Sequence, residues 1–200
     1  MAIESKKHLV ICLGNPGNDY KDTRHNAGFI FANFVREKCG FSPWQKSLPG
    51  KGEVSKGQIN GNDIFILKPH TFMNNSGEVV KPMLREIGEN VNIIVAHDDL
   101  DIAIGKFKLS HARGSGGHNG VESMISFMNG KDFSRIRIGI SPIDEEGLIR
   151  RPTDKNKESF VLKNFSTKER EKLNNSLNNL VEAFIIMVEK GIDEAMNKFN

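Results

Sequence analysis

Short apolar runs, each ending in a polar or glycine-rich loop, are the feature that most restricts what this chain can fold into. Residues 8–13 (HLVICL) run into Gly14, and residues 91–96 run into an acidic cluster. A continuous apolar run of this length is typical of a strand that is buried on both faces. Segments with helical spacing of apolar side chains separate these runs. The alternation predicts an α/β fold, and a length of 200 residues fits one domain over residues 1–200.

Local signals predict the other elements. Asn60-Gly61, between residues 53–59 and 63–67, predicts a β-hairpin, because this pair supplies the positive φ angles of a tight turn. Ser166 and Glu169 form a capping-box pattern before a long amphipathic C-terminal helix, which Gly191 separates from a short helix. Further helices are predicted at residues 28–39, with Asn26 as the cap, and at residues 121–128; a third is predicted after Asn75, which forms a capping pattern with Glu78. Strands are predicted at 102–109 and 135–140, and loops at 41–52 and 142–158.

Composition excludes several classes of protein. With 38% hydrophobic and 26% charged residues, the chain is globular and not disordered. A formal net charge of +3 does not by itself indicate a nucleic-acid partner. Cys12 and Cys39 match neither a disulfide framework nor a metal-knuckle spacing, so we expect two reduced thiols. No apolar run approaches the ~20 residues of a membrane span, and residues 1–8 lack a signal-peptide core, which predicts a cytoplasmic protein without a membrane partner.

Unusual polar residues follow the predicted strands: Asn15, His25, Asn74, Asp98, His118 and Asn119. Because loops at one end of a sheet can converge, these residues can form one site with a base, a carboxylate and three amides. The chain has neither a nucleophile elbow nor an HExxH sequence. A histidine backed by a carboxylate, without a protein nucleophile, favours direct activation of water. Taken singly, Asn15 also fits a turn residue and Asn74 also fits a helix-entry segment.

Basic side chains indicate an anionic part of the substrate. Lys106 and Lys108 share one face of a predicted strand, and the alternating RIRIGI segment places Arg135 and Arg137 on one face of another. The glycine-rich segment 110–120 leads into a helix and fits neither a Walker loop nor a Rossmann fingerprint. Amides suit a peptide and basic residues suit phosphate, so the substrate is predicted to be part peptide and part phosphate.

A set of motifs resembles the bacterial peptidyl-tRNA hydrolases, in the order of that family and over residues 8 to about 165. The motifs are Gly14-Asn15-Pro16-Gly17, Thr23-Arg24-His25-Asn26-Ala27-Gly28, Thr71-Phe72-Met73-Asn74 with Ser76-Gly77, His97-Asp98-Asp99-Leu100-Asp101, Gly116-Gly117-His118-Asn119-Gly120, and the segment from Phe133 to Ile140. Each motif alone is weak, but the set is specific. The resemblance implies a single domain with a twisted mixed β-sheet, acting as a monomer without metal, cofactor or obligatory protein partner. It also implies hydrolysis of the ester between a peptide and the 3′ ribose of tRNA, which releases free tRNA during translation.

The resemblance implies roles for individual residues. His25 would be the general base that activates water, and Asp98 would accept a hydrogen bond from its imidazole. Asn15 and Asn119 would complete the catalytic set by positioning water and peptide or by stabilising the oxyanion. The further substrate contacts that we expect are Tyr20, Asn26, Met73, Asn74 and His118.

The same resemblance assigns the tRNA contacts. Lys108 and Arg137 match a clamp for the 5′-phosphate of tRNA, and a guanidinium suits this task because it binds phosphate oxygens bidentately. The glycine-rich loop, with Arg113, is slightly longer and more basic than in the family, and Arg150-Arg151 is an extra basic pair. Asp99 stands where Glu is more usual.

Two alternative functions remain open. One is a metal-dependent hydrolase that uses the acidic cluster 97–101 with His118. Adjacent Asp98 and Asp99 argue against it, because neighbouring side chains of an extended segment point to opposite sides. The other is a non-catalytic RNA-binding module, which would explain Lys108 and Arg137 but would leave His25 without a role.

Overall fold

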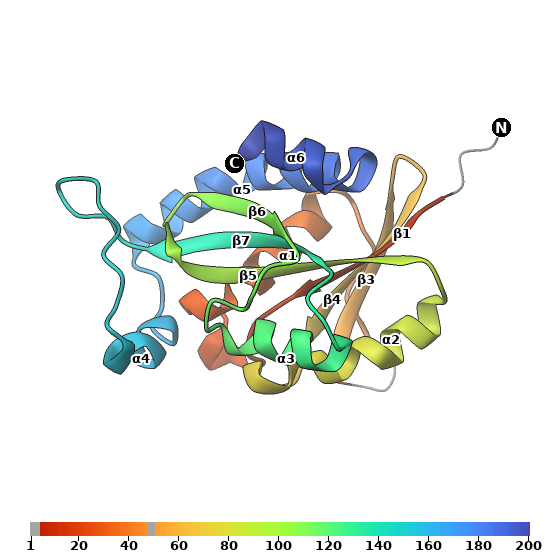
Figure 1. Ribbon diagram of the computed structural model, residues 1–200, viewed down its shortest axis with the longest axis horizontal. Helices are drawn as coiled ribbons and strands as arrows, with labels where there is room; N and C mark the ends of the chain where they lie inside the picture. Colours follow the sequence, from red (N-terminus) through yellow and green to blue (C-terminus); the bar gives the residue numbers. More distant parts are fainter. Residues whose placement is uncertain (1–4, 48–50) are drawn as a thin grey trace.

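A seven-stranded mixed sheet organises the computed structural model, which describes residues 5–47 and 51–200. The strand order is β2-β3-β4-β1-β5-β7-β6. β1 pairs in parallel with β4 and β5, and β5 pairs in parallel with β7, whereas the β2–β3, β3–β4 and β6–β7 pairs are antiparallel. The predicted mixed α/β fold is therefore confirmed, and Figure 1 shows the sheet between two layers of helices.

The elements alternate along the chain as the apolar runs predict. The strands are β1 (Lys7–Cys12), β2 (Gln45–Lys46), β3 (Gly52–Ile59), β4 (Asn62–Pro69), β5 (Val91–Ala103), β6 (Phe107–His111) and β7 (Ser134–Ser141). The α-helices are α1 (Ala27–Lys38), α2 (Val80–Ile87), α3 (Asn119–Met128), α4 (Lys157–Val161), α5 (Thr167–Lys190) and α6 (Ile192–Phe199). Four 3₁₀ segments complete the set: η1 (Asn18–Tyr20), η2 (Arg24–Asn26), η3 (Met73–Val79) and η4 (Asp154–Asn156).

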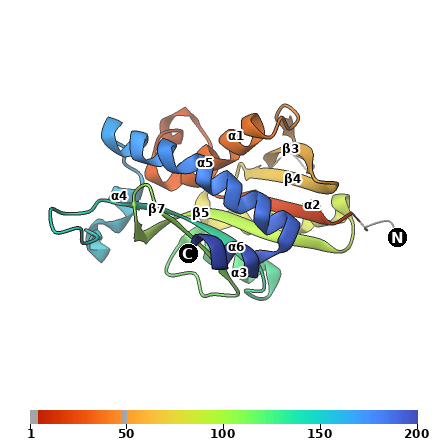
Figure 2. The same cartoon turned by 90° about the horizontal axis from the view of Figure 1, so that it is seen from above.

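Two hydrophobic clusters hold the helices against opposite faces of the sheet. On one face, α1, α5 and α6 pack together, and Phe31 of α1 meets Phe184 of α5 edge to face at 6.0 Å between ring centroids. Figure 2 shows α1 and α5 covering this face. On the other face, Met83 of α2 and Met124 of α3 pack over Ile11 of β1. After β1 the chain continues to α1 on one face of the sheet, and after β4 it continues to α2 on the other face. Because the connections from these neighbouring strands diverge, a crevice forms at the carboxyl ends of the strands.

Predictions that rest on local chemistry are confirmed. Asn60 and Gly61 form the turn between β3 and β4 with φ angles of 46° and 81°. Ser166 accepts a hydrogen bond from the Glu169 backbone N–H, and the Glu169 carboxylate accepts one from the Ser166 N–H at 2.8 Å. The capping box therefore begins α5 as predicted, and Gly191 separates α5 from α6.

The predicted boundaries of two strands are wrong. β5 does not end at Ala96 but continues to Ala103, because beyond the end of β1 it still pairs with β7. The acidic cluster 97–101 therefore lies within a strand. The predicted strand at 102–109 is divided by a turn at Gly105, where φ is 80°, so its first residues belong to β5 and its last to β6.

Two predicted helix caps are also wrong. Asn26 makes no side-chain cap on α1, because its amide is bonded to the loop after β1. Asn75 and Glu78 lie inside η3, and no side chain caps either η3 or α2, which begins at Val80. In this segment the backbone tightens into a 3₁₀ turn before the α-helix starts.

Two predicted loops contain regular structure. The segment 142–158 ends in η4 and the start of α4, and within it Ile143 and Ile149 form an isolated antiparallel bridge. The segment 41–52 contains β2 and the beginning of β3, and its residues 48–50 lie outside the described residues.

Both cysteines are free, as expected, with Cys12 buried and Cys39 partly buried. In the described ranges 5–47 and 51–200, no helix is both long enough and apolar enough to cross a membrane.

Candidate active site

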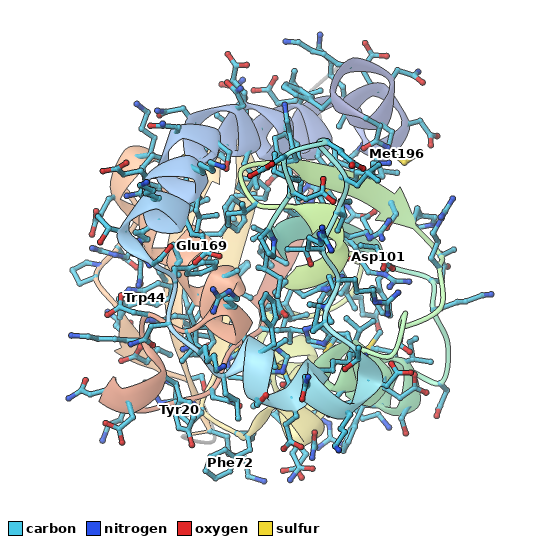
Figure 3. The ribbon with its side chains drawn as sticks, turned by 90° about the vertical axis from the view of Figure 1, so that its left-hand side faces the viewer. Tyr20, Trp44, Phe72, Asp101, Glu169 and Met196 are labelled. Atoms are coloured by element: carbon cyan, nitrogen blue, oxygen red, sulfur yellow. The ribbon has the colours of Figure 1, made fainter. Side chains whose placement is uncertain are left out.

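A cavity of about 820 Å³ lies at the carboxyl ends of the parallel strands. Its walls come from the loop after β1, η2, η3, β5, the glycine-rich loop, β7 and α4. Figure 3 views this end of the molecule, with Tyr20 and Phe72 on one side and Asp101 on another. The predicted site residues that line the cavity are Asn15, Tyr20, His25, Met73, Asn74, Asp98, His118, Asn119 and Arg137. The predicted residues Asn26 and Lys108 do not line it.

The extension of β5 places Asp98 in this cavity. β1 ends at Cys12, opposite Ala96 of β5, so Asp98 lies two residues beyond the last paired residue of β1. Pairing with Ile138 of β7 keeps this part of β5 extended. Asp98 is only 2% exposed, yet its carboxylate forms hydrogen bonds with two histidines, His25 and His118.

A close approach of α1 to the sheet brings His25 to Asp98. A Cβ atom at Gly28 would lie 2.4 Å from the Leu13 carbonyl oxygen and 2.7 Å from the Ala96 carbonyl oxygen. Only glycine allows α1 to start this close to the end of β1 and to Ala96 within β5. His25, three residues earlier, then lies with its Nδ1 2.9 Å from Asp98 Oδ1.

Asp98 Oδ1 is shared between two histidines. His118 Nε2 also lies 2.9 Å from this oxygen, and the rings of His25 and His118 are 5.0 Å apart at their centroids. His118 Nδ1 accepts hydrogen bonds from the N–H groups of Gly120 and Val121 and so caps α3. Because Nδ1 is an acceptor, Nε2 carries the proton and donates it to Asp98. Both ring nitrogens of His118 are therefore occupied by protein groups.

Interactions within the site raise the pKa of His25 and lower the pKa of Asp98. Burial and Lys157 act to lower the pKa of His25, but the charge and hydrogen bond of Asp98 outweigh them, and the pKa is raised above 6.5. Burial opposes ionisation of Asp98, but His25 and His118 hold the pKa of its carboxyl well below the usual range. Both histidines donate to the carboxylate, so it is fixed as an anion beside His25.

A neighbouring histidine remains neutral. Burial, the largest cause, lowers the pKa of His97 to about 3. Its Nδ1 donates to the Asp98 carbonyl oxygen at 2.7 Å, and its ring packs edge-on against His118 with 4.8 Å between centroids. His97 therefore supports the wall of the cavity without adding charge.

Asn15 is held by two neighbours that its motif does not contain. Its backbone N–H donates to Asn26 Oδ1 at 2.8 Å, and its carbonyl oxygen accepts from Asn26 Nδ2 at 3.0 Å. Its own Oδ1 accepts the Met73 N–H at 3.0 Å, which orients the amide. The Asn15 Nδ2 group is then the donor left for a ligand in the cavity. Asn26, 1% exposed, has both ends of its amide bonded to Asn15, so it supports the site from behind.

The remaining predicted substrate contacts surround this centre. Asn74 and Asn119 are exposed side chains on the cavity wall, at η3 and at the first residue of α3. Met73 is buried with 4% exposure, whereas Phe72 is 65% exposed in the same wall. The sequence motif contains Phe72, but motif-based reasoning did not single out this exposed apolar side chain as a part of the cavity wall.

The basic residues do not form one open patch. Lys108 and Arg137 lie opposite each other in the β6–β7 register, and Lys108 is exposed. Arg137 Nε donates to Asp99 Oδ2 at 2.8 Å, which fixes its guanidinium. Arg135 is 2% exposed and donates to backbone carbonyls of the glycine-rich loop, so the expectation that it offers an open anion site is wrong. Lys106 lies in the turn before β6 and not in a strand.

Arg24 is a structural link that the sequence alone did not indicate. Its guanidinium donates to the carbonyl oxygens of Lys163 and Asn164 and forms two hydrogen bonds with Glu169, at 2.9 and 2.8 Å. These bonds join the segment that carries His25 to the connection between α4 and α5. A pattern that repeats along one element cannot reveal such a pair, because the partners are about 145 positions apart.

One residue group has the composition of a metal site. Ligand atoms of His25, Asp98 and His118 lie within 4.8 Å of one another. The nearest atoms of both rings, however, are N–H groups that donate to one carboxylate oxygen, and a metal ligand must be a deprotonated nitrogen. Within the part of the chain that the structure describes, Asp98 is the only member of the cluster 97–101 that belongs to such a group. Asp99 instead pairs with Arg137, and Asp101 pairs with Arg151.

Comparisons with known proteins agree with these features. The family model described as peptidyl-tRNA hydrolase matches residues 9–200. The peptidyl-tRNA hydrolase of Fervidobacterium nodosum is 42% identical over 193 residues, which covers 96% of this chain and 95% of the relative. That of Caldanaerobacter subterraneus subsp. tengcongensis is 36% identical over 194 residues, covering 96% and 99%.

A solved structure shows the same fold. The crystal structure of peptidyl-tRNA hydrolase from Acinetobacter baumannii matches with a TM-score of 0.83 at 31% identity, covering 98% of this chain and 96% of that chain. Sequence and fold therefore agree over almost the whole length, and the chain belongs to the peptidyl-tRNA hydrolase family.

Proposed function

We propose that this protein hydrolyses the ester between a peptide and the 3′ ribose of tRNA, with His25 as the general base. Membership of the peptidyl-tRNA hydrolase family supports the reaction. The observation that supports the role of His25 is its 2.9 Å hydrogen bond from Nδ1 to the buried Asp98 carboxylate. That bond fixes the tautomer and leaves Nε2, on a ring that lines the cavity, as the acceptor for a proton of water.

The reaction proceeds in two steps. A water molecule attacks the ester carbonyl while one of its protons passes to His25 Nε2, and the carbonyl oxygen becomes an oxyanion. Asp98 stabilises the imidazolium that forms. The intermediate then expels the ribose 3′-oxygen, which takes the proton from His25. The products are a peptide with a free carboxyl group and a tRNA with a free 3′-hydroxyl.

The asparagine side chains and the residues around them take the remaining roles in substrate binding and catalysis. Asn15 Nδ2 is the oriented donor, so we assign it to the oxyanion, where one donor contributes about 3 kcal/mol to the transition state. The exposed Asn74 and Asn119 suit the peptide backbone, and Met73, Phe72 and Tyr20 supply apolar contacts. Asn26 and His118 act by positioning, because their polar atoms are bonded to Asn15, Asp98 and α3.

We assign binding of the 5′-phosphate of tRNA to Lys108 and Arg137. They lie in register on β6 and β7, and β7 is the strand next to β5, which carries Asp98. Arg137 has a fixed guanidinium, and the Lys108 ammonium has no hydrogen bond or ion pair with any described residue, a combination that suits the 5′-phosphate of tRNA.

Other parts of the proposal concern the protein as a whole. We assign residues 1–200 to one domain that acts as a monomer in the cytoplasm, without an obligatory protein partner. The connected sheet and the match of the family model to residues 9–200 support the single domain. A translation enzyme finds its substrate in the cytoplasm. Light scattering of the purified protein tests the monomer, with a mass of one chain as the expected result.

Single-turnover hydrolysis of N-acetylated aminoacyl-tRNA tests the role of His25. His25→Ala is expected to lower the rate by about 100-fold or more, because a general base contributes 10²–10⁴-fold, with tRNA binding largely retained. His111→Ala is the matched control, since His111 is an exposed histidine that pairs with Asp132 outside the cavity. Near-normal turnover of His25→Ala would refute the assignment.

The same assay separates the alternatives. A metal-dependent hydrolase, whether at the cluster 97–101 or at His25, Asp98 and His118, would lose activity in EDTA and regain it with zinc or manganese, whereas we expect the same rate with and without EDTA. A non-catalytic RNA-binding module would bind tRNA without releasing peptide from it.

A further inference from the structure

Arg135 is a buried cation without a carboxylate partner. It is 2% exposed, and among the described residues no acidic group lies within ion-pair distance of it. Its guanidinium donates to the carbonyl oxygen of Gly114 at 2.8 Å and to that of Arg113, while its Nε has no partner in the described part of the chain. Burial, and then the charge of Arg137, lower its pKa. Backbone carbonyls compensate a buried charge only partly, so positive potential remains here.

The same contacts tether the glycine-rich loop to the sheet. Ala112 and Gly116, on either side of the bonded carbonyls, have left-handed φ angles of 51° and 61°. The backbone therefore turns at Ala112 and at Gly116, and the guanidinium of Arg135 binds the carbonyl oxygens of Arg113 and Gly114 between these turns. This arrangement fixes the backbone of Arg113 although the loop has no regular secondary structure.

The side chain of Arg113 is free at the edge of the cavity. It is exposed, it lines the cavity, and its guanidinium has neither a hydrogen bond nor an ion pair with any described residue. Its charge also acts to lower the pKa of Arg135, which shows that the two guanidinium groups share one electrostatic environment. Arg137 lies two residues along the same face of β7, and its partner Asp99 is the acidic side chain that offsets this cluster.

We propose that Arg113 is a second phosphate-binding residue, held in place by Arg135, which contacts a phosphodiester of the tRNA acceptor end. This deepens the proposed function and rests on it. Lys108 and Arg137 take the terminal phosphate in that function, and Arg113 adds a contact on the wall of the cavity that Asp98 also lines. A free guanidinium on a held backbone loses little conformational entropy when it binds, and its fork matches phosphate oxygens. A phosphate there also compensates the buried charge of Arg135.

Binding of a deacylated acceptor-stem RNA with a 3′ CCA end, measured at several KCl concentrations, tests the proposal. This RNA carries no ester, so binding is measured apart from hydrolysis. Arg113→Gln is expected to reduce the slope of log K against log salt by about one and to weaken binding about fivefold at ~0.1 M salt. Arg113→Lys keeps the charge and is expected to keep the slope. Lys81→Gln is the control, because Lys81 is exposed on α2 and outside the cavity.

The outcomes separate the two levels of the proposal. A wild-type slope in Arg113→Gln, together with a reduced slope in Arg137→Gln, overturns the role of Arg113 and leaves the proposed function intact. Failure of the wild-type protein to bind this RNA overturns the proposed function itself. An effect of Arg113→Gln that is confined to KM for substrates with acidic peptides assigns the residue to the peptide and overturns the phosphate site. Equal melting temperatures of wild type and Arg113→Gln exclude misfolding as the cause of lost binding.

Discussion

Asp98→Asn tests the central electrostatic claim, because it removes one charge and keeps the size of the side chain. Asp98 Oδ1 accepts from His25 Nδ1 and His118 Nε2, both at 2.9 Å. An asparagine oxygen in the same place still accepts both hydrogen bonds, so the geometry can persist. What disappears is the negative charge beside the imidazolium that forms during proton transfer.

The magnitude follows from the position of the charge. Two unit charges about 4 Å apart attract by about 4 kcal/mol at an effective dielectric constant of ~20. The proton is only partly transferred in the transition state, so we expect a loss of about 2–3 kcal/mol, or roughly 100-fold in rate. Burial and Lys157 both lower the pKa of His25, and without Asp98 nothing of comparable size opposes them. In Asp98→Asn this pKa therefore falls below 6.5.

A pH series of single-turnover rates measures both effects. In the wild type, activity is expected to rise with pH through the raised pKa of His25, since the neutral ring is the base. In Asp98→Asn the plateau is expected to be about 100-fold lower, and the acid limb is expected to move to lower pH. Asp193→Asn on α6 is the control for loss of an exposed charge outside the cavity. A lower plateau with an unmoved acid limb would refute the electrostatic role and leave Asp98 only an orienting one.

Two further predictions concern stability. Gly28→Ala is expected to destabilise the fold by about 2 kcal/mol and to lower activity, because its Cβ would lie 2.4 Å from the Leu13 carbonyl oxygen. Chemical denaturation measures the loss, and Gly130→Ala is the control because the space around its Cβ position is open. Equal stability of the two variants would contradict the close approach. Burial, followed by Lys6, lowers the pKa of His8 from 6.5 to about 4, so its stabilising contribution is present above pH 6.5 and is lost as the pH falls toward 4. His8→Leu is expected to flatten the decline of melting temperature over this range, by the equivalent of about 3 kcal/mol at its acid end, and parallel curves for the two proteins would argue against the prediction.

Several elements follow from local sequence because their physical causes are local. The Asn-Gly turn needs only the φ angles of two residues, and the capping box of α5 joins groups three positions apart. The buried strand β1 is predicted by its continuous apolar run, which reflects burial on both faces. The motif residues of the site also come together as expected, because they follow strands whose carboxyl ends lie side by side.

Other features depend on partners distant in sequence. β5 continues through the polar residues 97–99 because β7 pairs with it, and no apolar residue in that stretch indicates the pairing. Arg135 alternates with isoleucines as an exposed residue would, but the glycine-rich loop covers it. The amide of Asn26, which fits a helix cap by its position, instead bonds both backbone groups of Asn15.

The sequence by itself determined the α/β class, the family resemblance and most of the predicted site residues that line the cavity, although Asn26 and Lys108 do not line it. Only the tertiary structure decided that one carboxylate oxygen of Asp98 serves both His25 and His118, and that Arg135 holds the backbone of the glycine-rich loop at Arg113 and Gly114. The physical reason is that hydrogen bonds and charges act across space between segments 20 to 145 positions apart, as the pairs His118–Asp98 and Arg24–Glu169 show. Periodicity and spacing report only on neighbours along one element.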